Sequence, residues 1–231
     1  MEIKADFHIH TKYSLEPQLL TVFGSARARY GPEAVFKRAR KIGLGAIAIT
    51  DHDTLAGVEV AKKIAKNFKD IIFIPGEEIT TTAGHIIALG ITEVIPRGVT
   101  PEEAVDRIKK QGGVAIAPHP FGIRYGVKNW IFKLPFDGIE TLNVWGTIGS
   151  NKKAQKAHEN IDVAAIGASD AHSISTIGKM YTKLEIKERT PEAVLNAIRK
   201  HKTEAFSTLS IFDFLKAILL GIGQTFISWK K

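Results

Sequence analysis

The chain alternates short apolar runs with amphipathic stretches along most of its length. The runs are rich in isoleucine, valine and alanine and are bounded by glycine, proline or polar residues, which is typical of buried strands. They predict seven strands, at Ile3–His8, Ala46–Thr50, Ile71–Pro75, His85–Leu89, Val114–Ala117, Gly138–Leu142 and Val163–Gly167. Stretches with helical spacing lie between several of these runs, which is the order of elements in βα units of a mostly parallel sheet.

Several of the helical stretches carry clear start and stop signals. A proline followed by glutamate marks the expected first turn of a helix at Pro32, Pro101 and Pro191. Gly43 and Gly112 fall where two of these helices are expected to end. About seven βα units without a linker or an internal repeat predict one α/β domain folded as a βα barrel, with a doubly wound open sheet as the alternative.

Histidines are concentrated at the predicted strand ends. Six of the eight lie at or beside such an end, mixed with aspartate and glutamate: His8, His10, His52, His85, His119 and His172. In a βα barrel the strand ends converge on one face, where the active sites of this architecture are built. The other two, His158 and His201, lie in lysine-rich helical segments and are expected at the surface.

The first strand leads into a short acid and histidine motif. Side chains alternate between the two faces of a strand, so Asp6, His8 and His10 are expected on one face, and Phe7 and Ile9 on the other. Two imidazoles on one face can bind a single divalent ion, and a pair of hydrogen-bonded core histidines is the alternative explanation.

The second strand is followed by two carboxylates around an imidazole. In this segment, residues 50–54, Asp51 and Asp53 flank His52. Such a set can supply one metal ligand together with the acceptors that orient it. Asp53 or Thr54 can also cap the helix that follows, and the two roles are compatible.

Three later strand ends carry further candidate ligands, and two of them combine acids with an imidazole. They are Glu77 and Glu78 with His85 nearby, His119 between two prolines, and Asp170 with His172. Carboxylate and imidazole donors without sulfur suit Zn, Mn or Fe(II).

Composition narrows the chemistry further. The 231 residues, 44% hydrophobic and 24% charged, predict one compact domain large enough to fold without a disulfide or a structural metal. The absence of cysteine excludes a thiol nucleophile, a disulfide framework and a thiolate-bound metal. The first residues lack the apolar stretch of a signal peptide, so we expect a cytoplasmic protein.

The net charge of +8 is compatible with a nucleic acid, an anionic membrane surface or an anionic small substrate. Lysine and arginine are scattered through helical segments without a block of like charges, as on solvated helix faces. A basic field of this kind still favours phosphorylated ligands.

Four motifs together resemble the PHP family of metal-dependent phosphoesterases, named for polymerases and histidinol phosphatases. They are His-x-His-Thr at 8–11, Thr-Asp-His-Asp-Thr at 50–54, the isolated histidine at 119, and Ser-Asp-Ala-His at 169–172. The resemblance implies a distorted (β/α)7 TIM-like barrel of the PHP type. We expect it to span residues 1–208, in agreement with the number of strands in the pattern.

The resemblance also implies two to three divalent ions, Zn, Mn or Fe, and assigns their ligands. The first ion would be held by His8, His10, Glu78 and Asp170, the second by Glu78 as a bridge with His85 and His119, and the third by His52 and His172. The third site of many relatives includes an acid or histidine after Ser14; here that position is Leu15, and Glu16 can substitute for it. Glu78 is preferred over Glu77 as the bridge on spacing alone.

The implied reaction is hydrolysis of a small phosphomonoester by a metal-activated hydroxide. The leaving alcohol would receive its proton from Asp51 or Asp53, or meet a third ion held in part by His172. Arg124 is the first candidate for a phosphate clamp, although a surface salt bridge explains it equally well, and Lys12 and Arg29 follow. The long segment 14–32 is expected to contribute to substrate selection.

Histidinol phosphate is the first substrate candidate and a nucleoside mono- or bisphosphate the second. A nucleic-acid-directed 3′-5′ exonuclease or phosphodiesterase and a metal-free scaffold are the other functions considered. Residues 209–231 are strongly apolar but interrupted by Asp213 and Lys216, so we expect a helix that closes the barrel or mediates a homo-oligomer contact. An interfacial membrane helix is the less favoured alternative.

Overall fold

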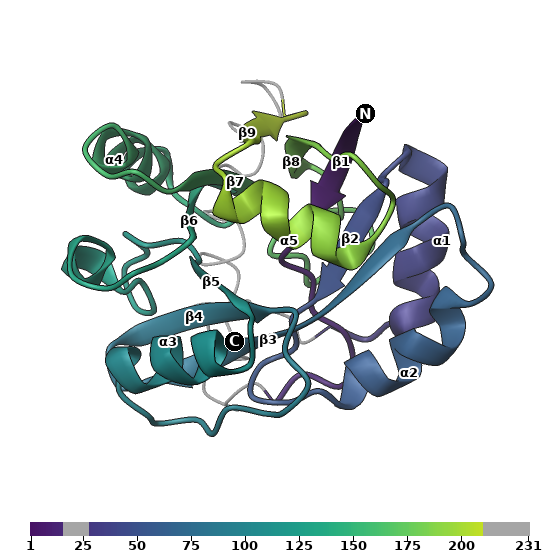
Figure 1. Cartoon of the computed structure of the whole chain (residues 1–231), viewed down its shortest axis with the longest axis horizontal. Coiled ribbons are helices and arrows are strands. Elements are labelled where there is room, and N and C mark those ends of the chain that lie inside the picture. The colour runs from purple at the N-terminus through teal and green to yellow at the C-terminus, as the bar shows by residue number, and fades with distance from the viewer. Residues whose placement is uncertain (16–27, 210–231) are drawn as a thin grey trace, which may run out of the picture.

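The computed structural model describes residues 1–15 and 28–209, in which strands and helices alternate (Figure 1). The elements are β1 (Glu2–Asp6), α1 (Pro32–Ile42), β2 (Ala46–Ile49), α2 (Ala56–Ala65), β3 (Ile72–Thr81), β4 (Gly84–Leu89), α3 (Pro101–Lys110), β5 (Val114–Ala117), the 3-10 helix η2 (Lys128–Phe132), β6 (Gly138–Asn143), α4 (Ile148–His158), β7 (Ala164–Ala168), β8 (Met180–Glu185), α5 (Pro191–Arg199) and β9 (Thr203–Ser207).

The strands form one sheet that curls into a nearly closed barrel, as the sequence predicted. Their order is β7-β6-β5-β4-β3-β2-β1-β8-β9. The ladders make seven of them parallel to one another, while β4 and β8 run in the opposite direction. Strand β4, predicted as part of the mostly parallel set, is therefore an exception, because a short turn after Thr81 returns the chain directly along β3.

The barrel is closed by side chains where β7 meets the β8–β9 hairpin, and by a backbone bridge between Ile9 and Ala171 just beyond β1 and β7. Thr182 Oγ1 donates to the carbonyl oxygen of Gly167 at 2.9 Å and accepts from its N–H at 3.1 Å. A Cβ at position 167 would lie 2.5 Å from the Tyr181 carbonyl oxygen, so only glycine permits this approach. One threonine thus bridges an edge at which no backbone ladder forms between the described strands.

The apolar interior of the barrel is closed at one end by α5, which crosses in front of the strands in Figure 1. Val194, Leu195 and Ile198 of this helix are buried in the same cluster as interior strand residues. Arg199 donates to the carbonyl oxygen of Gly112, just before β5 begins. Helix α5 therefore lies at the amino ends of the parallel strands, and their carboxyl ends are left for the site.

Six predicted strands agree with the structure to within two residues at each end, but three features differ. Strand β3 continues through Pro75 and Gly76, where the prediction ended. Strands β8 and β9 were not predicted, because charged residues interrupt both of them. Strand β9 supplies the seventh parallel strand in place of β4.

The predicted helix starts at Pro32, Pro101 and Pro191 are confirmed. Gly43 caps α1 with a φ of 74°, in the left-handed region that favours glycine. Of the two residues considered as caps of the next helix, Thr54 accepts from the Ala56 N–H at the start of α2 at 3.1 Å. Asp53 does not cap the helix, because its carboxylate accepts from Thr80 instead.

Two predicted segments lie outside the described residues. They are Glu16 with most of the segment 14–32, and the apolar C-terminal segment beyond Leu209, whose homo-oligomer or membrane contacts stay predictions. Among the helices that the structure describes, none combines the length and the apolar character needed to cross a bilayer.

Candidate metal centre

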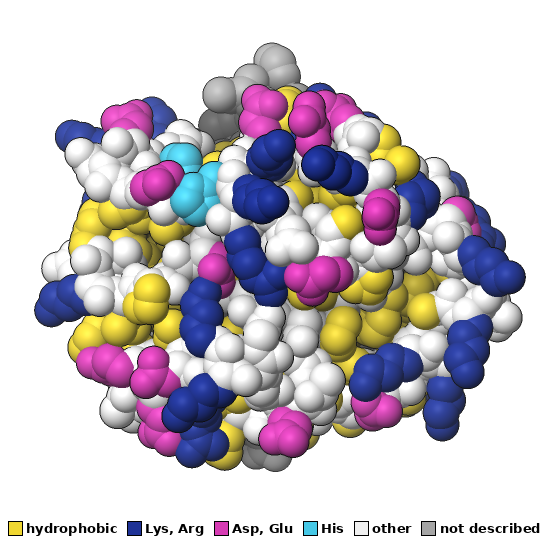
Figure 2. Space-filling model, viewed as in Figure 1, with side chains coloured by type: hydrophobic (Ala, Val, Ile, Leu, Met, Phe, Trp, Pro, Cys, Tyr) yellow, Lys and Arg dark blue, Asp and Glu magenta, His cyan; other side chains and the backbone are white. Residues whose placement is uncertain are grey.

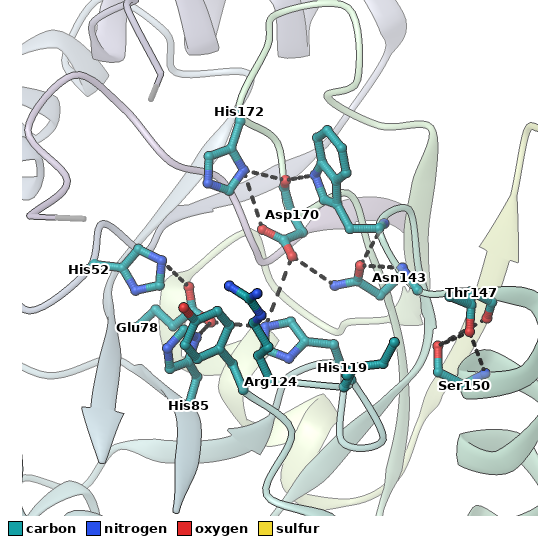
Figure 3. Close-up of a pocket in the computed structure, with 15 residues that line it drawn as sticks. His52, Glu78, His85, His119, Arg124, Asn143, Thr147, Ser150, Asp170 and His172 are labelled. Atoms are coloured by element: carbon teal, nitrogen blue, oxygen red, sulfur yellow. Dashed lines mark hydrogen bonds and ion pairs between the residues drawn. The ribbon is translucent and has the colours of Figure 1, made fainter. Parts of the chain in front are cut away.

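Glu78 lies at the centre of a cluster of imidazoles at the carboxyl ends of the strands (Figure 3). Its Oε2 is 3.1 Å from Nε2 of both His8 and His10 and 3.3 Å from Nε2 of His52. Its Oε1 is 2.9 Å from His85 Nδ1 and 3.1 Å from His119 Nε2. A single carboxylate is therefore shared by five imidazoles, a geometry suited to bridging two cations.

Asp170 joins the first pair of histidines from the opposite side. Its Oδ1 is 3.4 Å from His8 Nε2 and 3.3 Å from His10 Nε2, and the two Nε2 atoms are 3.0 Å apart. Two donors bound to one ion at about 2.1 Å stand about 3.0 to 3.4 Å apart in octahedral or tetrahedral geometry. These three residues thus have the spacing that one divalent ion requires.

The structure brings together eight of the nine residues predicted as metal ligands. They form four compact groups: His8, His10 and Asp170; His8, Glu78 and His119; His52, Glu78 and His85; and His10, His52 and His172. In the last group His10 accompanies the two histidines predicted for the third ion. Glu16, the ninth predicted ligand, lies outside the described residues.

Glu140, which the sequence interpretation missed, orients two of these histidines. His8 Nδ1 lies 2.8 Å from Glu140 Oε1, and the His119 N–H donates to Oε2 at 2.8 Å. A proton held on Nδ1 of His8 leaves the Nε2 lone pair directed at the cluster. The sequence feature that could have identified Glu140 is its place in the middle of an apolar strand, where an acid is expected only if it has buried partners.

The segment around His52 is fixed by hydrogen bonds to the neighbouring chain segments. Asp51 accepts from the N–H and hydroxyl of Thr11, at 2.5 and 2.7 Å, and Asp53 accepts from the N–H and hydroxyl of Thr80, at 2.7 and 2.9 Å. Both carboxylates thereby hold the loop in place. Their predicted role as proton donors stays a prediction.

The alternation of side chains predicted Asp6 on the same face as His8 and His10, but Asp6 lies outside the metal cluster. Strand β1 ends at this residue, and its buried carboxylate accepts from the backbone N–H groups of Ser169 and Gly178, at 3.1 and 2.9 Å. Burial raises the pKa of Asp6 to about 6, against the opposing effect of these bonds. Asp6 therefore connects the start of the barrel to the segment that carries Asp170.

Three residues of the site have left-handed backbone conformations. The φ angles are 56° at Asp53, 29° at His119 and 48° at Asp170. Such conformations cost about 1 to 3 kcal/mol each for residues other than glycine and cluster at functional sites. The prolines on both sides of His119 help to impose its conformation, since they restrict the neighbouring dihedral angles.

The charges of the cluster favour ionised carboxylates. Burial alone would raise the pKa of Glu78 and of Asp170, but the surrounding imidazoles hold both pKa values well below their usual range. Burial, together with neighbouring imidazoles, lowers the pKa of His52 well below 6.5, so this ring is neutral. The carboxylates in turn raise the pKa of His8, of His10 to about 9, and of His119, although burial alone would lower all three, so a cation that binds here would displace their protons.

A cavity of about 290 Å³ opens beside the cluster. It is lined by His52, Glu78, His85, His119, Gly122, Ile123, Arg124, Tyr125, Asn143, Trp145, Gly146, Thr147, Ser150, Asp170 and His172. Of the three predicted phosphate-binding residues, Arg124 lies in this cavity and points toward the cluster (Figure 3), whereas Lys12 and Arg29 are not part of its lining.

Aromatic side chains and an amide form the outer wall of this cavity. The ring of Tyr125 stacks on His85 with centroids 4.5 Å apart, and Trp145 Nε1 donates to the backbone oxygen of Asp170 at 2.7 Å. Asn143 Nδ2 donates to Asp170 Oδ2 at 3.3 Å, and its Oδ1 accepts from the Trp145 N–H. The wall is thus bonded to the metal centre itself, a connection that the sequence did not reveal.

The chain is similar to known proteins in sequence and in fold. Residues 149–203 match a family model described as PHP-associated. The chain is 43% identical over 144 residues to the uncharacterized protein MJ1587 of Methanocaldococcus jannaschii, and the alignment covers 62% of this chain and 83% of that protein.

Solved structures share the fold. A two-domain protein from Bacteroides vulgatus, containing a predicted PHP-like metal-dependent phosphoesterase, matches with a TM-score of 0.73 and 21% identity over 94% of this chain and 68% of its own. The lesion-specific endonuclease EndoQ of Pyrococcus furiosus matches with a TM-score of 0.61 and 17% identity, over 89% of this chain and 58% of its own.

Proposed function

Because the chain belongs to the PHP family, we propose that it is a metal-dependent phosphoesterase that hydrolyses a small phosphomonoester in the cytoplasm. The observation that carries the proposal is the shared carboxylate of Glu78, with five imidazole nitrogens within 3.3 Å and Asp170 across the cluster. This donor set fits divalent Zn, Mn or Fe.

The ligands divide between two to three ions. His8, His10, Glu78 and Asp170 would hold the first ion, Glu78 with His85 and His119 the second, and His52 with His172 the third, which His10 approaches as well. Bound ions supply a hydroxide near neutral pH and positive charge for the phosphoryl oxygens. Glu140 keeps the His8 ring oriented, and Arg124 at the cavity offers a planar pair of donors to phosphate.

The cavity favours a nucleoside phosphate over histidinol phosphate. The ammonium group of histidinol phosphate would need a carboxylate partner, and the acids in the described lining are Glu78 and Asp170, which belong to the metal cluster. Tyr125 and Trp145 instead offer flat apolar surfaces, which suit a nucleobase. Both substrate candidates belong in the same assay panel.

The test combines elemental analysis with turnover of p-nitrophenyl phosphate in Mn. We expect two to three divalent ions per chain and activity that chelation abolishes and Mn restores. His10→Ala and Asp170→Ala should lower kcat by about 100-fold or more, with a smaller change in KM, because each removes a ligand of the ion that activates the nucleophile. Less than one ion per chain together with chelator-resistant activity would contradict the proposal.

A second candidate function is hydrolysis of a nucleic acid, which the fold similarity to EndoQ favours. Bis-p-nitrophenyl phosphate and a single-stranded oligonucleotide are the discriminating substrates. Turnover of these diesters at a kcat/KM above that of the monoesters would assign the diesterase function to the same metal centre.

A further inference from the structure

The buried carboxylates around the metal centre depend on protein donors for their orientation. On the surface, lysine and arginine are interspersed with aspartate and glutamate, as on the face that bears α5 (Figure 2), where water can solvate them. Glu140 and Asp170, in contrast, are only 1% and 7% exposed, so groups of the protein must orient them. Asn143, the last residue of β6, donates to both and is the donor that these two carboxylates share.

Asn143 reaches these carboxylates because of an irregularity in β6. In a regular strand, residues three positions apart point to opposite faces of the sheet. The register of β6 against β7 shifts by one residue between Glu140 and Leu142. The extra residue brings Glu140 and Asn143 to the same side, with 2.7 Å between Oε2 and Nδ2. Bulges beside functional sites re-aim side chains in this way.

The side-chain amide of Asn143 has one possible orientation. Its Nδ2 lies 2.7 Å from Glu140 Oε2 and 3.3 Å from Asp170 Oδ2, and carboxylate oxygens accept hydrogen bonds. Its Oδ1 accepts from the N–H groups of Trp145 and Gly146, at 2.8 and 3.1 Å. The reverse orientation would set donors against donors and acceptors against acceptors. Both donors and both acceptor positions of this fully buried amide are therefore used.

The bond to Asp170 sets which of its oxygens faces the imidazole cluster (Figure 3). Oδ1 lies 3.4 and 3.3 Å from Nε2 of His8 and His10, while Oδ2 accepts from Asn143. The terminal torsion of an aspartate is only weakly restricted by its own rotamer preferences, so an external hydrogen bond is needed to fix the carboxylate. Without that bond, rotation would move Oδ1 from the position it shares with two imidazoles.

The bond to Glu140 acts on the same ion site through His8. Glu140 Oε1 lies 2.8 Å from His8 Nδ1. Its Oε2 accepts from the His119 N–H at 2.8 Å and from Asn143 at 2.7 Å. Because two donors fix Oε2, Oε1 stays directed at the His8 ring. Two of the residues that would hold the first ion thus depend on one amide.

We propose that Asn143 is a positioning residue of the metal centre, which sets the affinity of the first ion site and the turnover number by fixing Asp170 and Glu140. The inference rests on the proposed phosphoesterase function and adds a residue that acts through two others. Loss of such a partner changes metal affinity or activity by about 10- to 100-fold. The competing explanation, that Asn143 only shapes the cavity wall at Trp145 and Gly146, predicts altered substrate binding at an unchanged metal centre.

Two variants separate the bonds to the carboxylates from the bonds to the wall. In Asn143→Ser the shorter side chain can still accept from the Trp145 N–H, as serine does in turns, but it does not reach either carboxylate. Asn143→Asp keeps the shape and the Oδ1 acceptor but sets an oxygen against both carboxylates, and it takes over the comparison if the serine variant does not fold. The control is Asp137→Ser, which removes an acid with two donors of its own beside the opposite end of β6.

Two measurements report on the metal centre without turnover. They are Mn titration of chelator-treated protein, followed by electron paramagnetic resonance, and the visible spectrum of the Co(II) form. We expect Asn143→Ser to raise the dissociation constant of at least one Mn ion about tenfold, and both Asn143 variants to change the Co(II) spectrum. With p-nitrophenyl phosphate at saturating Mn, kcat should fall about tenfold in both variants, while KM changes less than about threefold. Asp137→Ser should match the wild type within about twofold throughout.

Wild-type Mn affinity, Co(II) spectrum and kcat in both Asn143 variants would overturn the proposal. A change in KM alone would confine Asn143 to the cavity wall, and an equal effect of Asp137→Ser would attribute the change to lost fold stability; either result overturns it as well. If no protein hydrolyses the ester, the phosphoesterase function fails, and the Mn and Co(II) measurements decide on Asn143 by themselves. Wild-type protein that binds neither ion would contradict both proposals.

Discussion

Replacing Glu77 by glutamine tests how the fold accommodates a carboxyl group buried outside the metal centre. Glu77 is fully buried; its Oε2 accepts from the Ile95 N–H at 2.9 Å, and Oε1 has no partner in the described part of the chain. Burial raises the pKa of Glu77 from 4.5 to about 8, with the Ile95 bond opposing the shift and the charge of Asp53 adding to it. At neutral pH the folded protein therefore holds this carboxyl group mainly protonated.

The direction of the pH dependence follows from this shift. A carboxyl group with a higher pKa in the folded state binds its proton more tightly there, so the free energy of unfolding falls as pH rises from about 5 to about 8. One pKa unit corresponds to about 1.4 kcal/mol, which gives an upper limit of about 4 to 5 kcal/mol, with about 2 to 3 kcal/mol lost between pH 5 and pH 7. Glutamine has a similar shape and does not ionise, so Glu77→Gln should remove this loss.

Urea denaturation at pH 5, 6, 7 and 8 in chelator measures the effect. We expect Glu77→Gln to match the wild type near pH 5 and to exceed its stability increasingly toward pH 8. Glu188→Gln, at an exposed position, should follow the wild-type profile at every pH. Parallel profiles for wild type and Glu77→Gln would show that Glu77 is ionised in the folded state and would refute the reasoning.

Three further outcomes are expected. Gly57→Ala should lower the free energy of unfolding by about 2 to 4 kcal/mol in thermal denaturation, because its Cβ would lie 2.1 Å from Asp51 Oδ2 and displace that carboxylate. The control Gly149→Ala, whose Cβ would have no atom nearer than 3.9 Å, should leave the stability unchanged. Thr182→Val should lower the free energy of unfolding by about 2 to 3 kcal/mol in urea denaturation, because it leaves the Gly167 N–H and carbonyl groups unpaired. A loss below about 0.5 kcal/mol, the size of a neutral substitution, would mean that the seam between β7 and the β8–β9 hairpin holds without these two bonds. Adding Mn at about 1,000 times its dissociation constant to protein freed of metal by a chelator should raise the free energy of unfolding by about 4 kcal/mol. An unchanged Tm in calorimetry would argue against a metal site.

The sequence predicted the fold where apolar runs are buried on both faces and failed where they are not. Strands β2 and β5 are entirely buried and read as continuous apolar runs, so their positions were clear. In β8 and β9, Lys183 and Glu204 alternate with apolar residues, and the pairing of β8 with β1 joins segments far apart in the chain. Neither feature has a local signal, because the stabilising contacts are non-local.

The candidate site was predictable to the extent that histidines follow strand ends. Their convergence on Glu78, and the exclusion of Glu77 from the cluster, follow from the side-chain alternation in β3, whose extension past Pro75 was not foreseen. Glu140 and Asn143 were missed because their role depends on reaching His8 and Asp170 from another strand. Partners of that kind are set by the register of the sheet, which a single sequence does not specify.

The seam at Thr182 has a consequence for how the native protein opens. Ladders of backbone hydrogen bonds join neighbouring strands around the rest of the barrel, while β7 and the β8–β9 hairpin are joined through one hydroxyl group and close packing. Sub-global opening should therefore begin at this line, and the β7 amides that face it should exchange with deuterium sooner than those of β2 and β3. Opening there would expose the apolar interior, and we expect proteolysis and aggregation to begin at this seam.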